Sequence, residues 1–242
     1  MSKLPKAPLV EVIFEVRWVI QSKELQEMQY LYGDLYQLLK EEYPVRETVN
    51  PQVPVDFFLI HAPIHRFRKS KGGYPLVQIG PGIMTVNTVD SAYFWEEYEQ
   101  RIIDAVEKLK SIYAFKHQHN VTLSLQYIDL LRFNFGASDI IRYLEEYLHI
   151  SIKQNFYSGP ASAQHVGLVL AFPNQLGTLT VSLGRGKNIK GADGLAIQTG
   201  IKSSTIKPET DFVKNWLNEA HELCSNSFKQ MTEGKLYESF KK

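Results

Sequence analysis

The sequence predicts an α+β protein built from two similar halves. Three observations lead to this fold class: runs of alternating apolar residues that are typical of strands, longer segments with apolar residues three and four apart that are typical of helices, and the same order of these elements in residues 1–117 and 118–242. We expect each half to contain a strand, a helix, three strands and a second helix. Each half should form a curved, mainly antiparallel sheet packed on a long helix.

The first half begins with an alternating run from Val10 to Trp18, which predicts a strand with one face in the core. A helix, three strand-like runs and a second helix follow, over residues 25–39, 57–60, 75–80, 83–89 and 95–112. Asp90 or Ser91 is the expected N-cap of the second helix.

The second half opens with a long alternating run over residues 121–133. A shorter helix is expected after Ser138 as its cap, followed by strands over 164–172, 177–183 and 194–200. Pro208 fits the first turn of a final helix.

Short matching segments recur in the same order in both halves. Arg17-Trp18 matches Arg132-Phe133 at a spacing of 115, Val77–Gly80 matches Ile197–Gly200 at 120, and Trp95 matches Trp216 at 121. The slow growth of the spacing is what small loop insertions would produce, so we expect an internal duplication about a pseudo-twofold axis. The order of elements is similar to that of the TATA-binding-protein and helix-grip folds; the similarity is one of element order alone, and no function follows from it.

Composition excludes several classes of protein. The chain has 27 basic and 26 acidic side chains, which gives a formal net charge of +1. A net charge this small does not favour binding to nucleic acid or to an acidic membrane. Cys224 is the single cysteine, which rules out an internal disulfide and favours a reducing compartment. The N-terminus resembles no secretory signal and no segment is apolar enough to span a bilayer, so we expect a cytoplasmic protein without a membrane partner.

The charges are nevertheless segregated along the chain. Residues 57–89 and 147–192 contain no acid, whereas the predicted helix after Asp90 is acidic. These two acid-free regions hold two basic hairpin loops, which could bind an anion such as a phosphodiester backbone or a nucleotide. Lysines that keep hairpin turns in solvent would give the same pattern. The candidate anion-binding residues are Arg66, Arg68, Lys69, Lys71, Arg185, Lys187 and Lys190.

Asp129 is the most unusual residue, because it occupies an apolar position of a predicted strand. A buried carboxylate needs a partner, and Arg132 or Arg17 would provide one. Glu15–Arg17 and Asp129–Arg132 would then be equivalent ion pairs that tie the two halves together. The alternative is that Asp129, Arg132 and Glu15 line a cleft between the halves, with shifted pKa values.

Histidine and cysteine residues do not form a convincing catalytic or metal-binding set. His61 and His65, and His117 and His119, lack neighbouring cysteine or carboxylate ligands, and His221 near Cys224 lacks an oxyanion site. The sequence therefore predicts no metal, no cofactor and no catalytic residue.

The run Leu4–Trp18, which includes Pro-Leu-Val-Glu-Val-Ile-Phe-Glu-Val-Arg-Trp, resembles the start of a sporadically distributed, functionally uncharacterised bacterial family of about 250 residues. The segments Leu125–Asp129 and Trp216–His221, with Phe228 and Met231-Thr232, resemble the same family, which more often carries Asn at the position of Asp129. The resemblance implies a bacterial cytoplasmic protein and no established activity.

Three functions remain open. The first is a non-catalytic binding or adaptor protein that acts with a macromolecular partner, with self-association through its aromatic, acidic helices. The second is nucleic-acid or nucleotide binding through the two basic loops, which would make affinity strongly salt-dependent. The third is a small-ligand sensor or an enzyme with a cleft between the halves.

Overall fold

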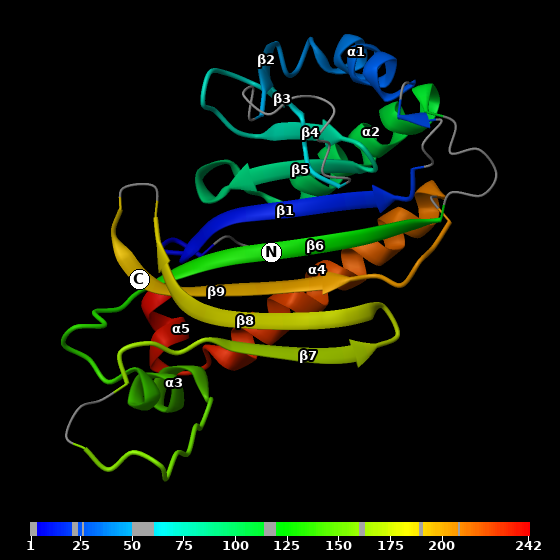
Figure 1. Ribbon diagram of the computed structural model, residues 1–242. Coiled ribbons are helices and arrows are strands. Elements are labelled where there is room, and N and C mark those ends of the chain that lie inside the picture. Colours follow the sequence, from blue (N-terminus) through cyan, green and yellow to red (C-terminus); the bar gives the residue numbers. More distant parts are fainter. Residues whose placement is uncertain are drawn as a thin grey trace.

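The computed structural model describes residues 4–20, 24–25, 27–49, 61–113, 120–159, 163–188, 191–207 and 209–242. These residues form one antiparallel sheet of nine strands in the order β2-β3-β4-β5-β1-β6-β9-β8-β7 (Figure 1). The strands are β1 (Leu9–Trp18), β2 (Val45–Thr48), β3 (His65–Arg68), β4 (Leu76–Gly80), β5 (Ile83–Val89), β6 (Val121–Arg132), β7 (Leu168–Asn174), β8 (Gly177–Lys187) and β9 (Asp193–Lys202).

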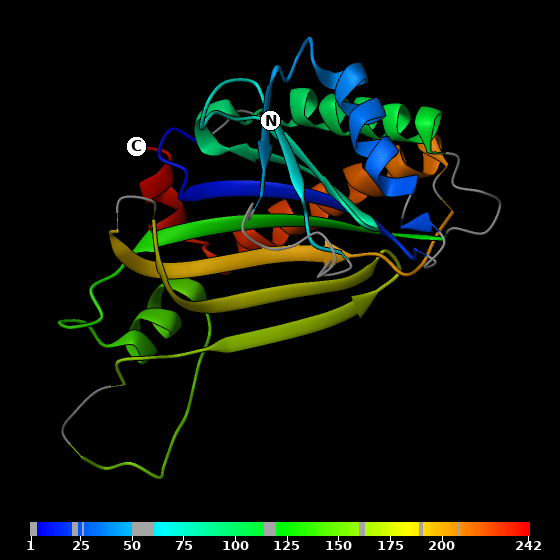
Figure 2. The same ribbon diagram turned by 45° about the horizontal axis from the view of Figure 1, so that its top comes forward.

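The helices lie on one face of this sheet (Figures 1 and 2). They are α1 (Glu27–Leu39), α2 (Trp95–Ile112), α3 (Ile140–Leu148), α4 (Thr210–Met231) and α5 (Lys235–Phe240), together with a 3-10 turn over Asp90–Ala92. In Figure 1, α2 and α4 cross behind the central strands, and the opposite face of the sheet is open. The predicted α+β class is therefore confirmed. None of the helices in the described part of the chain has the length and apolar character to cross a membrane.

Strands β1 and β6 are the central pair, and their alternation determines which side chains meet the helices. In β1 the even-numbered residues from Val12 to Trp18 are buried, while Glu15 and Arg17 project from the open face. In β6 the odd-numbered residues from Val121 to Leu125 are buried against the helices. The same alternation places Asp129 on the helix side of the sheet.

The core consists of two clusters of apolar residues. The larger lies beneath α1, α2 and the first part of α4, and includes Phe14, Leu35 and Ile102. The smaller lies beneath α3 and α5, and includes Leu144 and Ile197. Tyr127 packs against the larger cluster and Leu131 belongs to the smaller one. Asp129 therefore lies between two cores, where the apolar packing on β6 is interrupted.

One pair of the segments that match in the sequence does not occupy matching places in the sheet. Val77–Gly80 lies in β4, two strands from β1, whereas Ile197–Gly200 lies in β9, directly beside β6. The two basic loops likewise join different strands, β3 to β4 and β8 to β9. A spacing of 120 residues thus does not connect equivalent strands.

Several local expectations differ from the structure. Asp90 and Ser91 form the 3-10 turn, and α2 begins at Trp95 without a side-chain cap. Asp139, not Ser138, caps α3, because its Oδ1 accepts hydrogen bonds from two backbone N–H groups of the first turn. Strand β2 and helix α5 are too short to carry a clear period. The predicted strand over 57–60, His117, His119 and Pro208 lie outside the described residues.

Candidate functional site

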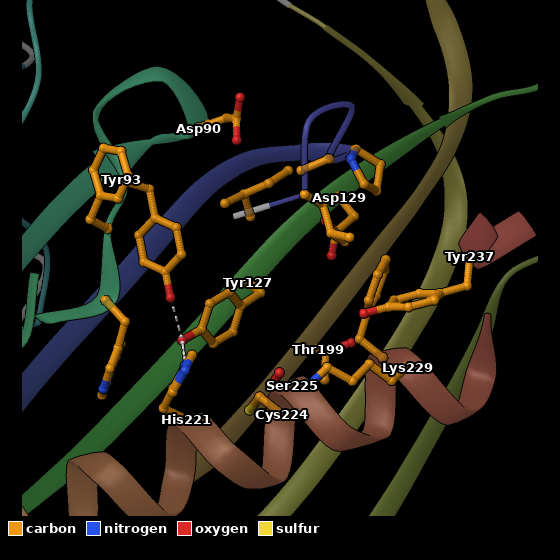
Figure 3. A pocket seen from close by; sticks show the side chains of 17 residues that line it. Asp90, Tyr93, Tyr127, Asp129, Thr199, His221, Cys224, Ser225, Lys229 and Tyr237 are labelled. Carbon is orange, nitrogen blue, oxygen red and sulfur yellow. Dashed lines mark hydrogen bonds between the residues drawn. The ribbon is translucent and has the colours of Figure 1, made fainter. Parts of the chain in front are cut away.

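A cavity of about 180 Å³ lies between the sheet and α4, at the junction of the two core clusters. Residues of both halves line it, from the N-terminal segment, the turn before α2, β6, β9, α4 and α5 (Figure 3). Its lining residues are Leu4, Ala7, Pro8, Leu9, Asp90, Tyr93, Phe94, Trp95, Tyr127, Asp129, Thr199, His221, Cys224, Ser225, Phe228, Lys229 and Tyr237.

Asp129 contributes a carboxylate to this cavity from β6, and only 5% of the residue is exposed. Figure 3 shows its side chain between Tyr127 and Tyr237, pointing toward α4. Within the described part of the chain, Asp129 makes neither a hydrogen bond nor an ion pair. Burial, and then the negative charge of Asp90, raise the pKa of Asp129 to about 7.

Thr199 lies beside Asp129 on the neighbouring strand β9, opposite Tyr127 in the register. It is 1% exposed, and its Oγ1 is buried without a hydrogen-bond partner among the described residues. Two polar side chains in contact with the same cavity therefore have unused hydrogen-bonding capacity. Such groups are rare in folded proteins, because an unmet buried polar group costs about 1–3 kcal/mol.

On the other side of the cavity, three polar side chains satisfy one another. The hydroxyls of Tyr93 and Tyr127 lie 3.2 Å apart, and the Tyr127 hydroxyl lies 2.7 Å from Nδ1 of His221 (Figure 3). Trp95 stacks on the His221 ring, with centroids 3.8 Å apart and an interplanar angle of 9°. Burial, with the positive charge of Lys229 as a further cause, lowers the pKa of His221 to about 4. His221 is therefore neutral at physiological pH.

Cys224 lies one turn of α4 beyond His221, is buried and forms no disulfide. Burial raises the pKa of its thiol to about 12, so the thiol is protonated at neutral pH. The residue fills the wall of the cavity as a small apolar side chain.

The N-terminal segment closes one end of the cavity. The Lys6 N–H donates to the carbonyl of Phe240 at 3.0 Å, which holds this segment against α5. The Leu130 N–H donates to the carbonyl of Pro8 at 2.9 Å. These bonds place Leu4, Pro8 and Leu9 over the sheet beside Asp129, although more than a hundred residues separate them in sequence.

The ion pairs expected for Asp129 are absent from the described residues. Arg17 binds Glu15 instead, with Nη2 and Oε2 2.7 Å apart, on the open face of the sheet. Arg132 lies at the exposed end of β6 and does not contact Asp129. Alternation along the strands explains this outcome, because odd positions of β1 and the position of Asp129 in β6 point to opposite faces. Of the four residues predicted to form an ion pair or a cleft, only Asp129 enters the cavity.

The two arginines of the first predicted basic loop, Arg66 and Arg68, lie in strand β3 and have partners within the protein. Arg68 is buried, and it donates to Oε2 of Glu47 at 2.8 Å and to the carbonyl of Gly73 at 2.9 Å. Arg66 donates to Oε1 of Gln78 at 2.9 Å. Lys69 and Lys71 are exposed on the turn.

In the second basic segment, Arg185 lies in strand β8. It pairs with Asp193 at 2.5 Å and lies over the ring of Phe135, 5.2 Å from its centroid. Lys187 is exposed at the end of β8, and Lys190 lies outside the described residues. Both loops lie at the same end of the sheet, but five strand-to-strand steps separate β4 from β8, roughly 24 Å. The arginines of both basic segments thus have partners within the protein, whereas Lys69, Lys71 and Lys187 are exposed.

Sequence reasoning singled out Asp129 but not the residues around it. Tyr127 precedes it on the same face of β6, and this period of two is the one local signal that could have linked them. Thr199 and Tyr237 come from elements distant in sequence. No group of three or more potential metal ligands is present in the described ranges. No protein-family model, curated protein or solved structure gives a significant match to this chain.

Proposed function

We propose that the protein binds a small organic molecule in the cavity at Asp129, and that it acts as a ligand-binding or sensing protein. The observation that carries this proposal is the buried carboxylate of Asp129, which faces a cavity without a partner within the described chain. This function corresponds to the third hypothesis from the sequence, a cleft between the halves.

Asp129 carries the argument because its position has an energetic cost. Removing a carboxylate from water without a partner costs several kcal/mol, and it raises the pKa as found for Asp129. The unmet hydroxyl of Thr199 adds to this cost beside the same cavity. A ligand that binds both groups would remove the penalty, and apolar cavities with a few convergent polar groups are the usual form of small-molecule sites.

Binding is better supported than covalent catalysis. The Cys224 thiol is protonated because burial raises its pKa to about 12, which leaves it a poor nucleophile. His221 is held by Tyr127 and Trp95, so its ring is positioned as part of the wall. The adaptor function and the bacterial family resemblance stay predictions, because no described feature tests them.

Internal duplication remains part of the proposal. On one side of the central β1–β6 pair the order is β5, β4, β3, and on the other it is β9, β8, β7. Read outward from the central pair, the two orders correspond strand by strand, with β5 in the place of β9. This correspondence supports a duplication about a pseudo-twofold axis, with the strand order of the TATA-binding-protein fold. The cavity would then lie at the seam between the two copies.

A fragment screen by ligand-observed NMR tests the proposed function. The library should contain cationic, neutral and anionic fragments of one ring, each measured with the wild type and with Ser225→Phe, which fills the cavity from α4. The matched control is Ser111→Phe, on the exposed surface of α2. We expect fragments that bind the wild type and Ser111→Phe but not Ser225→Phe. If no fragment binds, or if all hits bind Ser225→Phe equally, the proposal is wrong.

A further inference from the structure

We infer that the ligand is a compact organic cation, a protonated amine or amidine on about one ring, whose positive group lies against Asp129. This inference rests on the proposed function and specifies the class of ligand. It follows from the charges that face the cavity, the hydrogen-bonding groups left unused there, the aromatic walls and the volume.

The charged groups around Asp129 favour a positive ligand. Asp90, from the turn before α2, lines the same cavity, and its negative charge acts on Asp129. His221 adds no positive charge, because its pKa is lowered to about 4. The titratable and charged side chains that line the cavity are Asp90, Tyr93, Tyr127, Asp129, His221, Cys224, Lys229 and Tyr237. Among these lining residues, Lys229 carries the one positive charge, because His221 is neutral. Asp90 and Asp129 supply two carboxylates, so negative groups outnumber positive ones.

The unused hydrogen-bonding groups require a ligand that donates. The hydroxyls of Tyr93 and Tyr127 are engaged with each other and with His221. An ionised Asp129 only accepts hydrogen bonds, and the Thr199 hydroxyl can also accept one. An ammonium or amidinium group supplies two or three donors and a charge, and bonds of this kind are about twice as strong as neutral ones.

The walls suit the apolar body of such a cation. Six aromatic side chains line the cavity: Tyr93, Phe94, Trp95, Tyr127, Phe228 and Tyr237. Aromatic faces attract cations, and the attraction is stronger where water is excluded. Phe94 is half exposed, which places it at the rim where a ligand would enter.

The volume limits the size of the ligand. A dry cavity of about 150 Å³ accommodates benzene. The 180 Å³ available here therefore accepts one six-membered ring with a short substituent.

Isothermal titration at pH 8 with three matched probes tests the charge of the ligand. The probes are benzylammonium, benzyl alcohol and benzoate, which share a ring and differ in charge. We expect benzylammonium to bind the wild type at least tenfold more tightly than benzyl alcohol, and benzoate to bind more weakly than either. Asp129→Asn should lose at least tenfold in affinity for benzylammonium and less than twofold for benzyl alcohol. The control is Asp34→Asn, an exposed residue of α1, which should behave as the wild type.

A second measurement uses the wild type alone and does not depend on a folded variant. Because a cation requires ionised Asp129, affinity for benzylammonium should fall by up to about a hundredfold between pH 8 and pH 5, while affinity for benzyl alcohol stays constant.

The outcomes separate the two proposals. If benzyl alcohol or benzoate binds as tightly as benzylammonium, or if Asp129→Asn binds all three unchanged, the inference of a cation is wrong while a ligand site remains. If none of the three probes binds and the fragment screen also finds nothing, the proposed function fails together with it.

Discussion

Asp129 of β6 and Leu9 of β1 face each other at the point where the register of the central strand pair shifts. Leu9 pairs with Asp129, but Glu11 pairs with Ile128, so Val10 is an extra residue in β1. A bulge of this kind locally bends a strand and redirects side chains, and bulges are enriched beside functional sites. The irregularity thus coincides with the one carboxylate that interrupts the apolar face of β6.

Replacing Asp129 with Asn is expected to stabilise the protein at alkaline pH. The folded-state pKa of Asp129 is about 7, above its ordinary value of 3.8, so the folded state binds the proton more tightly than the unfolded state. Wild-type stability should therefore fall as pH rises from about 4 through 7 and become level above about 8. The free energy of unfolding of Asp129→Asn relative to the wild type should increase by about 3 kcal/mol between pH 5 and pH 8.

Urea denaturation at both pH values measures this difference. Asp34→Asn serves as the control, because Asp34 is exposed on α1. A difference that stays constant with pH would mean that burial does not raise the pKa of Asp129.

Replacing His221 with Gln is expected to remove an opposite pH dependence. The folded-state pKa of His221 is about 4, below its ordinary value of 6.5, so the unfolded state binds the proton more tightly. Stability from this group is present above pH 6.5 and is lost as pH falls toward 4. His221→Gln should lose stability at pH 7.5 through the lost stacking on Trp95, and this loss should shrink by up to about 2 kcal/mol at pH 5.

The measurement is again urea denaturation, with exposed His165→Gln as the control. Direct evidence comes from NMR of the His221 ring, which should stay neutral between pH 7 and pH 5. A His221 signal that titrates near pH 6.5 would contradict the burial described here.

Replacing Tyr127 with Phe should break the chain that connects Tyr93 and His221. The change removes the 2.7 Å bond to Nδ1 of His221 and leaves that nitrogen without its partner. We expect a loss of about 1–3 kcal/mol in the free energy of unfolding. Tyr36→Phe is the matched control, since its hydroxyl binds the Pro44 carbonyl near the surface and should matter less. Equal losses in the two variants would show that Tyr127 has no special role in holding His221.

Removing the exposed lysines of the basic loops tests the nucleic-acid hypothesis. The variant combines Lys69→Ala, Lys71→Ala and Lys187→Ala, all exposed positions. Because Arg66, Arg68 and Arg185 are occupied by internal partners, we expect no binding of labelled DNA or RNA that depends on these lysines. Fluorescence anisotropy at about 50 and 200 mM salt measures it. Salt-sensitive binding by the wild type that the triple variant loses would contradict this expectation and support nucleic-acid binding through these loops.

Local sequence determined the elements of this fold. The period of two over residues 10–18 and 121–132 predicted β1 and β6, and helical spacing predicted α1, α2 and α4, because side-chain direction repeats along each element by itself. The same alternation placed Asp129 on the apolar side of its strand. Strands β2 and β3 and helix α5 were not predicted, because each is too short for its apolar residues to show a clear period.

Tertiary structure alone decided the surroundings of Asp129. Whether a carboxylate is paired depends on groups that folding brings close, and the two arginines expected to pair with Asp129, Arg17 and Arg132, point to other surroundings. The pairing of β6 with β1 and β9 brings Leu9 and Thr199 close to Asp129. The packing of α4 and α5 on the sheet places His221 and Tyr237 around the same cavity. The cavity and the absence of a partner for Asp129 in the described chain both depend on segments distant in sequence. The burial that raises the pKa of Asp129 does so too, because the whole packed core excludes solvent and no single segment does.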